Sequence, residues 1–266
     1  MKTIAIIGVS TGQRAICLKA REMGLRTIAF GWDNGAVCKS IVDKYYPISI
    51  TDVDNIVDIC RKEAVSGVVS NASDLTVKVV SAVSTKLGLR GNDPVVIDNI
   101  LNKFYVREVS GNIQGLSNPK FCLAAELPCN WRYPCIVKPV SGSGKQGVMY
   151  VETPEEMKNA LNYTSRTELA DILVEEYISG RELSVEAISY KGKHQVIQIT
   201  DKENTGSPHF VEIGHHQPAD LTDEMKGRIE TIVRALLDQL NYQNGASHIE
   251  IKVDNNDNIY LIEINP

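Results

Sequence analysis

Apolar and polar residues alternate in two runs near the end of the chain, at 248–253 and 259–265, with a polar Asp-Asn-Asn-Asp-Asn segment between them. A period of two residues is typical of a half-buried strand, so this pattern predicts a β-hairpin. If the turn is centred in the polar segment, Glu250 lies opposite Glu263. Both carboxylates then project from one face, with the amide of Asn265 beside them.

The first hundred residues alternate short apolar runs with stretches of helical spacing. We expect strands at 3–9, 26–30 and 67–70, each followed by a helix, with the helices ending near residues 23, 63 and 87. This alternation implies a parallel sheet. Asn71 and Asp74 follow the third strand, at the carboxyl edge where such a sheet presents ligand-binding groups.

The middle of the chain shows less regularity than its second half. Several Gly, Asn and Pro residues between 89 and 129 predict a linking segment. Later, Thr222 is placed to cap a helix with a strong apolar stripe. The stripe positions are predicted to be core: Met225, Ile229, Ile232, Val233, Leu236, Leu237 and Leu240.

Composition narrows the possible classes of protein. The chain has 266 residues and is 43% hydrophobic, so it is longer than an average domain and two or three modules are expected. Its net charge of −5 argues against a nucleic-acid-binding protein, which needs a basic face. No apolar run is long enough for a membrane span, and no signal-peptide pattern follows Met1, so we expect a cytoplasmic protein. The six cysteines are scattered without zinc-site spacing and are interpreted as reduced thiols.

The hairpin carboxylates carry the first candidate chemistry. Facing carboxylates such as Glu250 and Glu263 destabilise a sheet unless something neutralises them. With Asn265 they form an all-oxygen ligand set, which a hard divalent cation such as Mg²⁺ prefers, with Mn²⁺ as an alternative. A solvated polar face is the other interpretation of the same pattern.

A Gly/Ser-rich turn follows a short apolar strand at 134–140. Its glycines let the backbone approach a bulky anion, while Lys138 in the strand and Lys145 in the turn supply positive charge. The residue order is not that of a Walker A loop, and a plain hairpin turn is the alternative. A half-buried strand rarely carries Lys without an anionic partner, which favours phosphate binding. The candidate phosphate contacts in the turn are Ser141, Gly142, Ser143, Gly144 and Gly147.

These patterns together resemble the ATP-grasp superfamily, most closely the carboxylate–amine ligases related to biotin carboxylase and the carbamoyl phosphate synthase large chain. The hairpin and the Gly/Ser turn match two motifs of that family. Asn102-Lys103-Phe-Tyr-Val-Arg107 is similar to its Asp-Lys-x-x-x-Arg element. The segment 172–186 is similar to the one that joins the two halves of the ATP-grasp fold and holds adenine. The resemblance runs through the whole chain.

The resemblance implies a role for each residue that matches the adenine segment. Glu175 would accept a hydrogen bond from the adenine amino group, and Glu182 would bind the ribose hydroxyls. The backbone of Glu176 and Ile178 would bond the edge of the ring.

The phosphates and the metal would be held by the other matching residues. Lys103, Lys138 and Lys202 would contact the phosphates, with Lys138 and Lys202 as the catalytic cations that stabilise charge on the transferred phosphoryl group. One or two Mg²⁺ ions, held by the two hairpin carboxylates and Asn265, would bridge the phosphates of ATP.

The segment Phe-Val-Glu212-Ile-Gly-His215-His216-Gln-Pro looks like the substrate-facing part of the amino-acid ligase branch of this family. Glu212, His215 or His216 would then line the acceptor pocket, and Asn71 and Asp74 of the first module are further candidates. Adjacent residues of a strand face opposite ways, so at most one of the two histidines is expected to face the site.

The implied fold is α/β with an α+β core: a Rossmann-like pre-ATP-grasp domain with a parallel sheet, followed by an ATP-grasp fold. We expect three parts at 1–100, 101–178 and 179–266, the last of them incomplete. The implied activity is ATP-dependent phosphorylation of a carboxylate to an acyl phosphate, which an amine captures to give an amide or peptide bond. The expected partners are these small-molecule substrates and a second copy of the chain in a homodimer, with neither nucleic acid nor a membrane.

Two alternatives to this activity stay open. One is an enzyme like carbamoyl phosphate synthase or biotin carboxylase, which activates bicarbonate. The other is a nucleotide-binding fragment without turnover, because family members continue with an arginine after Glu-x-Asn-Pro, whereas this chain stops at Pro266. That arginine commonly helps to hold substrate or phosphoryl oxygens, so we expect an incomplete catalytic unit.

Overall fold

The computed structural model describes residues 1–167, 171–207 and 210–266. Contacts within the chain divide it into two compact units, Met1–Asp98 and Asn99–Pro266. A further division of the second unit near residue 178 stays a prediction. Among the described residues, no helix combines the length and the apolar character that crossing a membrane would require.

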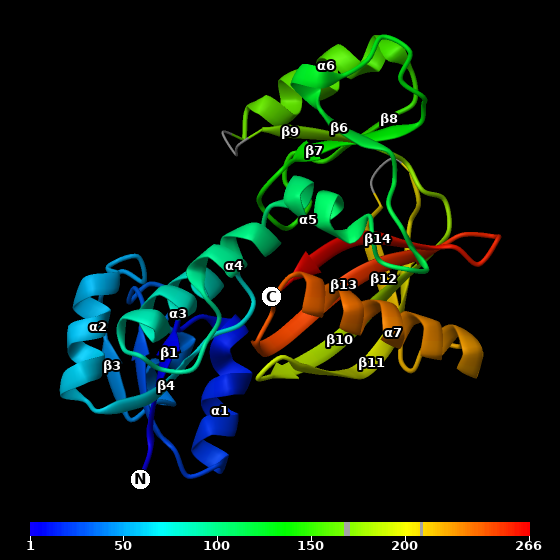
Figure 1. The fold of residues 1–266 in the computed structure, drawn as a ribbon. Helices are drawn as coiled ribbons and strands as arrows, with labels where there is room; N and C mark the ends of the chain where they lie inside the picture. The colour runs from blue at the N-terminus through cyan, green and yellow to red at the C-terminus, as the bar shows by residue number, and fades with distance from the viewer. Residues whose placement is uncertain (168–170, 208–209) are drawn as a thin grey trace. The chain divides into compact units, whose positions relative to one another are not determined.

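The first unit is built on a four-stranded sheet in the order β3-β2-β1-β4 (Figure 1). Every pairing in this sheet is parallel, as the alternation of strands and helices predicted. β3 was not predicted, because its three residues are too few to show a periodic pattern. The strands are β1 Thr3–Ile7, β2 Arg26–Phe30, β3 Lys44–Tyr46 and β4 Val65–Val69.

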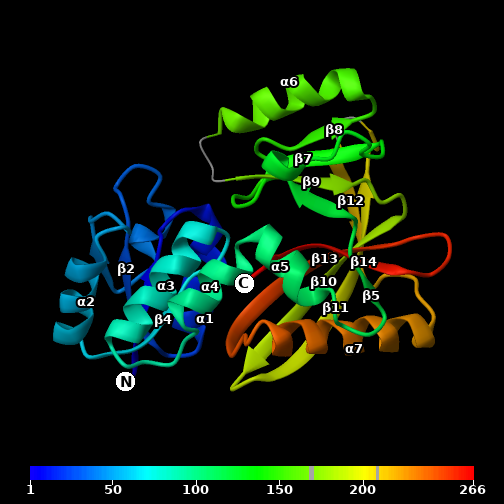
Figure 2. The same ribbon diagram turned by 45° about the horizontal axis from the view of Figure 1, so that its top comes forward.

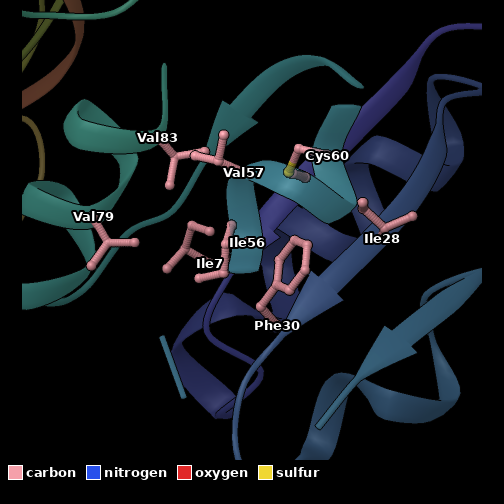
Figure 3. Close-up of a cluster of buried hydrophobic side chains, with 9 residues drawn as sticks. Ile7, Ile28, Phe30, Ile56, Val57, Cys60, Val79 and Val83 are labelled. Atoms are coloured by element: carbon pink, nitrogen blue, oxygen red, sulfur yellow. The ribbon is translucent and has the colours of Figure 1, made fainter. Parts of the chain in front are cut away.

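Helices pack on both faces of this sheet. Figure 3 shows one core cluster, in which side chains of α2 and α3 meet Ile7, Ile28 and Phe30 of the strands. α1 packs on the other face through Cys17. The Asp52 side chain caps α2 by accepting a hydrogen bond from the amide of Asn55. The helices are α1 Arg14–Glu22, α2 Val53–Lys62 and α3 Asp74–Lys86, with 3-10 turns η1 Thr11–Gln13 and η2 Val37–Ser40.

The second unit contains two sheets (Figure 2). The four-stranded sheet has the order β6-β9-β7-β8 and carries α6 on one face. The six-stranded sheet has the order β12-β11-β10-β13-β14-β5 and packs against α7. The strands are β5 Leu116–Ser117, β6 Phe121–Leu123, β7 Cys135–Pro139, β8 Met149–Val151, β9 Ile172–Glu176, β10 Arg181–Tyr190, β11 Lys193–Asn204, β12 Glu212–His216, β13 Asn244–Val253 and β14 Ile259–Asn265.

The predicted linking segment at 89–129 contains short elements that were not predicted. This stretch contains α4 Pro94–Ile100, α5 Lys103–Ser110, the 3-10 turn η3 Ala124–Glu126 and the short strands β5 and β6. The Asn102 side chain caps α5 by accepting a hydrogen bond from the amide of Tyr105. The Gly, Asn and Pro residues therefore mark turns between short elements.

The hairpin and the long helix of the second unit form as predicted. β13 and β14 are antiparallel, with Glu250 opposite Glu263 and His248 opposite Asn265. The remaining helices are α6 Pro154–Ser165 and α7 Asp223–Gln239. The stripe residues predicted for α7 are all buried, so its apolar face forms part of the core.

Candidate functional site

A pocket of about 670 Å³ lies between the two sheets of the second unit. Ligand pockets span about 300–1,000 Å³, so a nucleotide fits a pocket of this size. The pocket brings together ten residues assigned to nucleotide or metal from the sequence: Lys103, Lys138, Gly142, Ser143, Glu175, Glu176, Ile178, Glu182, Glu250 and Glu263. Other assigned residues of this unit lie outside the lining: Ser141, Gly144, Gly147, Lys202, Glu212, His215, His216 and Asn265.

Strand alternation explains how β7 contributes to this pocket. Cys135 and Val137 are fully buried in the core beneath α6. Ile136 and Lys138 alternate with them and line the pocket on the opposite face of the sheet. The sequence of β7 does not show which of its residues face the core and which face the pocket, because most residues of both sets are apolar.

A buried ion cluster lies at the wall of the pocket. Arg107 Nε lies 2.6 Å from Glu175 Oε1, and Lys138 Nζ lies 2.5 Å from Glu175 Oε2. Arg107 also donates to the carbonyl oxygen of Ile262 at 2.7 Å. Burial alone would raise the pKa of Glu175, but the two cations lower it to about 2. The anionic partner expected for Lys138 is therefore the carboxylate of Glu175. Contact between Lys138 and a phosphate stays a prediction.

Lys103 connects the Gly/Ser turn to the metal candidates. Its Nζ donates to the carbonyl oxygen of Gly142 at 2.6 Å and lies 3.0 Å from Glu263 Oε1. Gly147, farther along the turn, has a φ of +72°, and a Cβ there would lie 2.7 Å from a methyl carbon of Thr167. This glycine is therefore required by backbone conformation and packing, whereas Gly142 and Ser143 face the pocket.

We expect the segment 141–147 to exchange its amide hydrogens rapidly without nucleotide. Among its amides, that of Gln146 donates the one backbone hydrogen bond in the described structure, at 3.5 Å. Adding ATP and Mg²⁺ should slow exchange in this segment, which hydrogen exchange with mass spectrometry measures. Gly144→Val should reduce this protection, because Gly144 has a φ of +68° that Val rarely adopts.

The first unit offers a matched control for this substitution. Gly35 has a φ of +73° and, like Gly144, open space where a Cβ would stand. Gly35→Val should therefore introduce similar backbone strain without changing nucleotide-dependent protection. Slow amide exchange of 141–147 in the free protein, or exchange that does not change when nucleotide is added, would contradict nucleotide binding by this segment. The segment would then be a plain turn.

The hairpin places a set of oxygen donors on one face of the six-stranded sheet. Glu250 and Glu263 face each other, and Asn265 lies two residue pairs farther along. This donor set fits Mg²⁺, which is usually bound by one or two carboxylates with water and phosphate oxygens completing its shell. Among the described residues, no group of three or more His, Cys, Asp or Glu side chains could hold a metal. The amide of Asn265 or the oxygens of a bound phosphate are therefore needed beside the two carboxylates.

Lys202 is buried among three carboxylates. Its Nζ lies 2.7 Å from Glu250 Oε1. Glu182 Oε1 and Glu212 Oε1 each lie 3.1 Å from the same nitrogen. Burial alone would lower the pKa of Lys202, but these carboxylates raise it well above its usual value. Contact with a terminal phosphate would require Lys202 to exchange one of these partners.

The predicted acceptor residues lie on β12, at the edge of the six-stranded sheet. Glu212 Oε1 lies 3.3 Å from Nζ of Lys145, the lysine of the Gly/Ser turn. His215 Nε2 lies 3.5 Å from Glu212 Oε2, whereas His216 Nε2 lies 3.4 Å from Glu203 Oε2. The two histidines thus have different carboxylate partners, and their roles toward a substrate stay predictions.

One end of the pocket is aromatic, which the sequence analysis did not predict. The rings of Tyr150, Tyr177 and Phe210 have centroids 5.0–5.6 Å apart. Lys252 Nζ lies 4.8 Å from the Tyr177 centroid and donates to the carbonyl oxygen of Ile178 at 3.1 Å. These rings come from separate segments, so no local pattern relates them. The one signal was the position of Tyr177 inside the adenine-like segment.

Asn71 and Asp74 belong to the first unit, and their role as substrate contacts stays a prediction. The Asn71 side chain donates to the carbonyl oxygen of Gly12 at 2.9 Å, and the backbone carbonyl oxygen of Asn71 accepts from the Gln13 side chain at 2.8 Å. Asp74 begins α3. Both residues follow β4, so they lie at the predicted carboxyl edge of the sheet.

Comparison with known proteins supports the family suggested by these residues. The family described as ATP-grasp domain matches residues 131–266, about half of the chain. The formate-dependent phosphoribosylglycinamide formyltransferase of Corynebacterium jeikeium is 24% identical over 286 residues, covering 99% of this chain and 67% of that protein. The carbamoyl phosphate synthase large chain of Agathobacter rectalis is 25% identical over 241 residues, covering 85% of this chain and 22% of that protein.

A solved structure extends the similarity to the whole fold. The L-amino acid ligase from Bacillus licheniformis has a TM-score of 0.82 at 25% identity, covering 100% of this chain and 66% of that one. The chain therefore spans about two thirds of the formyltransferase and of the amino acid ligase. The expected α/β fold is confirmed by this similarity and by the parallel sheet of the first unit.

Proposed function

Because the chain belongs to the ATP-grasp family, we propose that it uses ATP and Mg²⁺ to convert a small-molecule carboxylate into an acyl phosphate and to join that intermediate to an amine. The observation that carries this proposal is the pocket in which lysines meet facing carboxylates. Lys103 and Lys138 line it together with Glu250 and Glu263. Lysines complement phosphate oxygens, and facing carboxylates complement a cation bridging those phosphates.

The two ends of the pocket suggest how ATP would lie in it. The aromatic end, with Tyr177 and Ile178, offers a stacking surface and backbone groups for a base. Glu182 also lines the pocket and is placed to bind ribose hydroxyls. The triphosphate would then reach Lys103 and the amides of the Gly/Ser turn.

Catalysis would rest on positioning and on electrostatics. Lys138 would stabilise the negative charge on the transferred phosphoryl group. Glu250, Glu263 and Asn265 would hold Mg²⁺, which when bound neutralises the charge of the phosphates. The Gly/Ser turn would exclude water from the reactive acyl phosphate, because hydrolysis would compete with the amine. Glu212 and His215 would bind the acceptor.

An ADP-release assay tests this function. With ATP and Mg²⁺, we expect release of ADP that requires an acid together with an amine, measured over a panel of amino acids. Release with bicarbonate alone would favour the alternative activity, for which the similarity to carbamoyl phosphate synthase argues. Binding of ATP by calorimetry without release under any of these conditions would reduce the chain to a nucleotide-binding module.

A further inference from the structure

One face of the six-stranded sheet carries a polar row, of which the proposed function uses only the metal candidates. His248 pairs with Glu186 of β10 on one side and with Asn265 of β14 on the other. Two residues along β13, Glu250 pairs with Glu263. Directly paired residues share a face and strand side chains alternate, so these five residues lie on the same face. His248 and Glu186 are therefore direct neighbours of the metal candidates.

Hydrogen bonds join this row to the Glu250 carboxylate. His248 Nδ1 lies 2.7 Å from Glu186 Oε1, and His248 Nε2 lies 3.3 Å from Glu250 Oε1. Both partners are carboxylate oxygens, which accept, so both ring nitrogens donate.

Lys202 donates to the same oxygen of Glu250. Its Nζ lies 2.7 Å from Glu250 Oε1, so two donors converge on one oxygen of this carboxylate. Within the described part of the chain, Glu250 Oε2 has no hydrogen-bonding partner. Lys202 also forms ion pairs with Glu182 and Glu212. Among the described residues, His248 has no acceptor other than Glu186 and Glu250.

We propose that Glu186 and His248 are positioning residues, which together with Lys202 hold Oε1 of Glu250 and leave Oε2 to bind the divalent cation. This inference rests on the proposed function, because it assigns the cation to Glu250. Rotation of a carboxylate about its last bond exchanges the two oxygens, and two donors on one oxygen prevent that exchange. Glu186 orients the imidazole ring, as carboxylates beyond the ligand sphere commonly do in metal sites.

Binding of Mn²⁺ tests this role without any need for turnover. Electron paramagnetic resonance measures the affinity of the folded chain for Mn²⁺ in the presence of ADP. His248→Phe keeps a ring but removes both hydrogen bonds, and should weaken Mn²⁺ binding about 10- to 100-fold. His248→Gln retains a donor for Glu250 and should restore part of the affinity. Glu186→Gln leaves the imidazole in place and should cause a smaller loss.

A second histidine on the same sheet provides the control. His194 of β11 bonds Ser189 at 2.7 Å and lies 3.2 Å from Asp238, away from Glu250, so His194→Phe should leave Mn²⁺ affinity unchanged. Urea unfolding of each variant separates a loss of stability from a loss of metal affinity. A His248→Phe protein that binds Mn²⁺ within twofold of the unaltered chain would overturn the positioning role. If His248→Phe does not fold, an unchanged affinity in Glu186→Gln would do the same.

The same titration separates this inference from the proposed function. If the unaltered chain binds no Mn²⁺, or if Glu250→Gln binds it equally well, the metal assignment itself is wrong. If Glu250→Gln loses Mn²⁺ while His248→Phe and Glu186→Gln do not, the metal assignment stands and the positioning role is wrong.

Discussion

Arg107→Met should lower the free energy of unfolding of the second unit by about 3–5 kcal/mol, the usual cost of removing one partner from a buried ion pair. The Arg107 side chain is 1% exposed and its guanidinium bonds both Glu175 and the carbonyl oxygen of Ile262. Met fills a similar volume but supplies no charge and no donors. Glu175 would keep Lys138 as its one cationic partner in the described cluster.

Urea denaturation followed by tryptophan fluorescence measures this loss. The chain has two tryptophans, Trp32 in the first unit and Trp131 in the second. A Trp32→Phe background makes Trp131 the reporter for the unit that contains Arg107. Arg181→Met is the control, because the Arg181–Asp201 pair is more exposed and should contribute less than about 1 kcal/mol. Equal losses for the two arginine variants would show that the buried cluster is not a major source of stability.

Glu250→Gln combined with Glu263→Gln should weaken binding of ATP in the presence of Mg²⁺ by at least about 100-fold, because changes to residues that only support metal ligands already cost about 10- to 100-fold. Glutamine has the shape of glutamate but neutralises the carboxylate that attracts the cation. Adenosine binding should change little, since adenosine carries no phosphate for a cation to bridge. Calorimetry with each ligand measures the difference.

Removal of the metal tests the same site in a second way. For the unaltered chain, EDTA should weaken ATP binding and leave adenosine binding unchanged. Glu203→Gln is the control variant, because Glu203 is an exposed carboxylate outside the pocket lining. An affinity for ATP that is the same with Mg²⁺ and with EDTA would remove Glu250 and Glu263 from the metal role.

The protein itself relieves part of the repulsion on which the metal assignment was first based. Lys202 and His248 contact Glu250, and Lys103 contacts Glu263. Burial would raise the pKa of Glu250, but His248 and Lys202 lower it to about 2. The oxygen donors and the neighbouring pocket therefore favour a cation at this site more than repulsion between the facing carboxylates does.

Local periodicity was enough to determine several features of this protein. A period of two residues predicted both strands of the hairpin, and Glu250 lies opposite Glu263 as expected, beyond a one-residue shift in the pairing between Glu250 and Ile251. Helical spacing fixed the buried face of α7, and the side chain of Thr222 caps that helix as predicted. These features depend on residues that are close together in the chain, so the local sequence is enough to predict them. The elements at 89–129 were not predicted for the same reason, because elements of two to eight residues are too short to show a period.

Only the tertiary structure decided which charged groups meet. A pattern shows which face of a strand a side chain occupies, but its partner depends on how distant segments pack. Arg107 and Glu175 are 68 positions apart, and Lys202 and Glu250 are 48 positions apart. Lys138 illustrates the difference: its place in a strand indicated an anionic partner, and packing of β7 beside β9 supplied the Glu175 carboxylate. The sequence therefore determined many of the elements and the motifs, whereas strand pairing and packing between distant segments decided the charge network around the pocket.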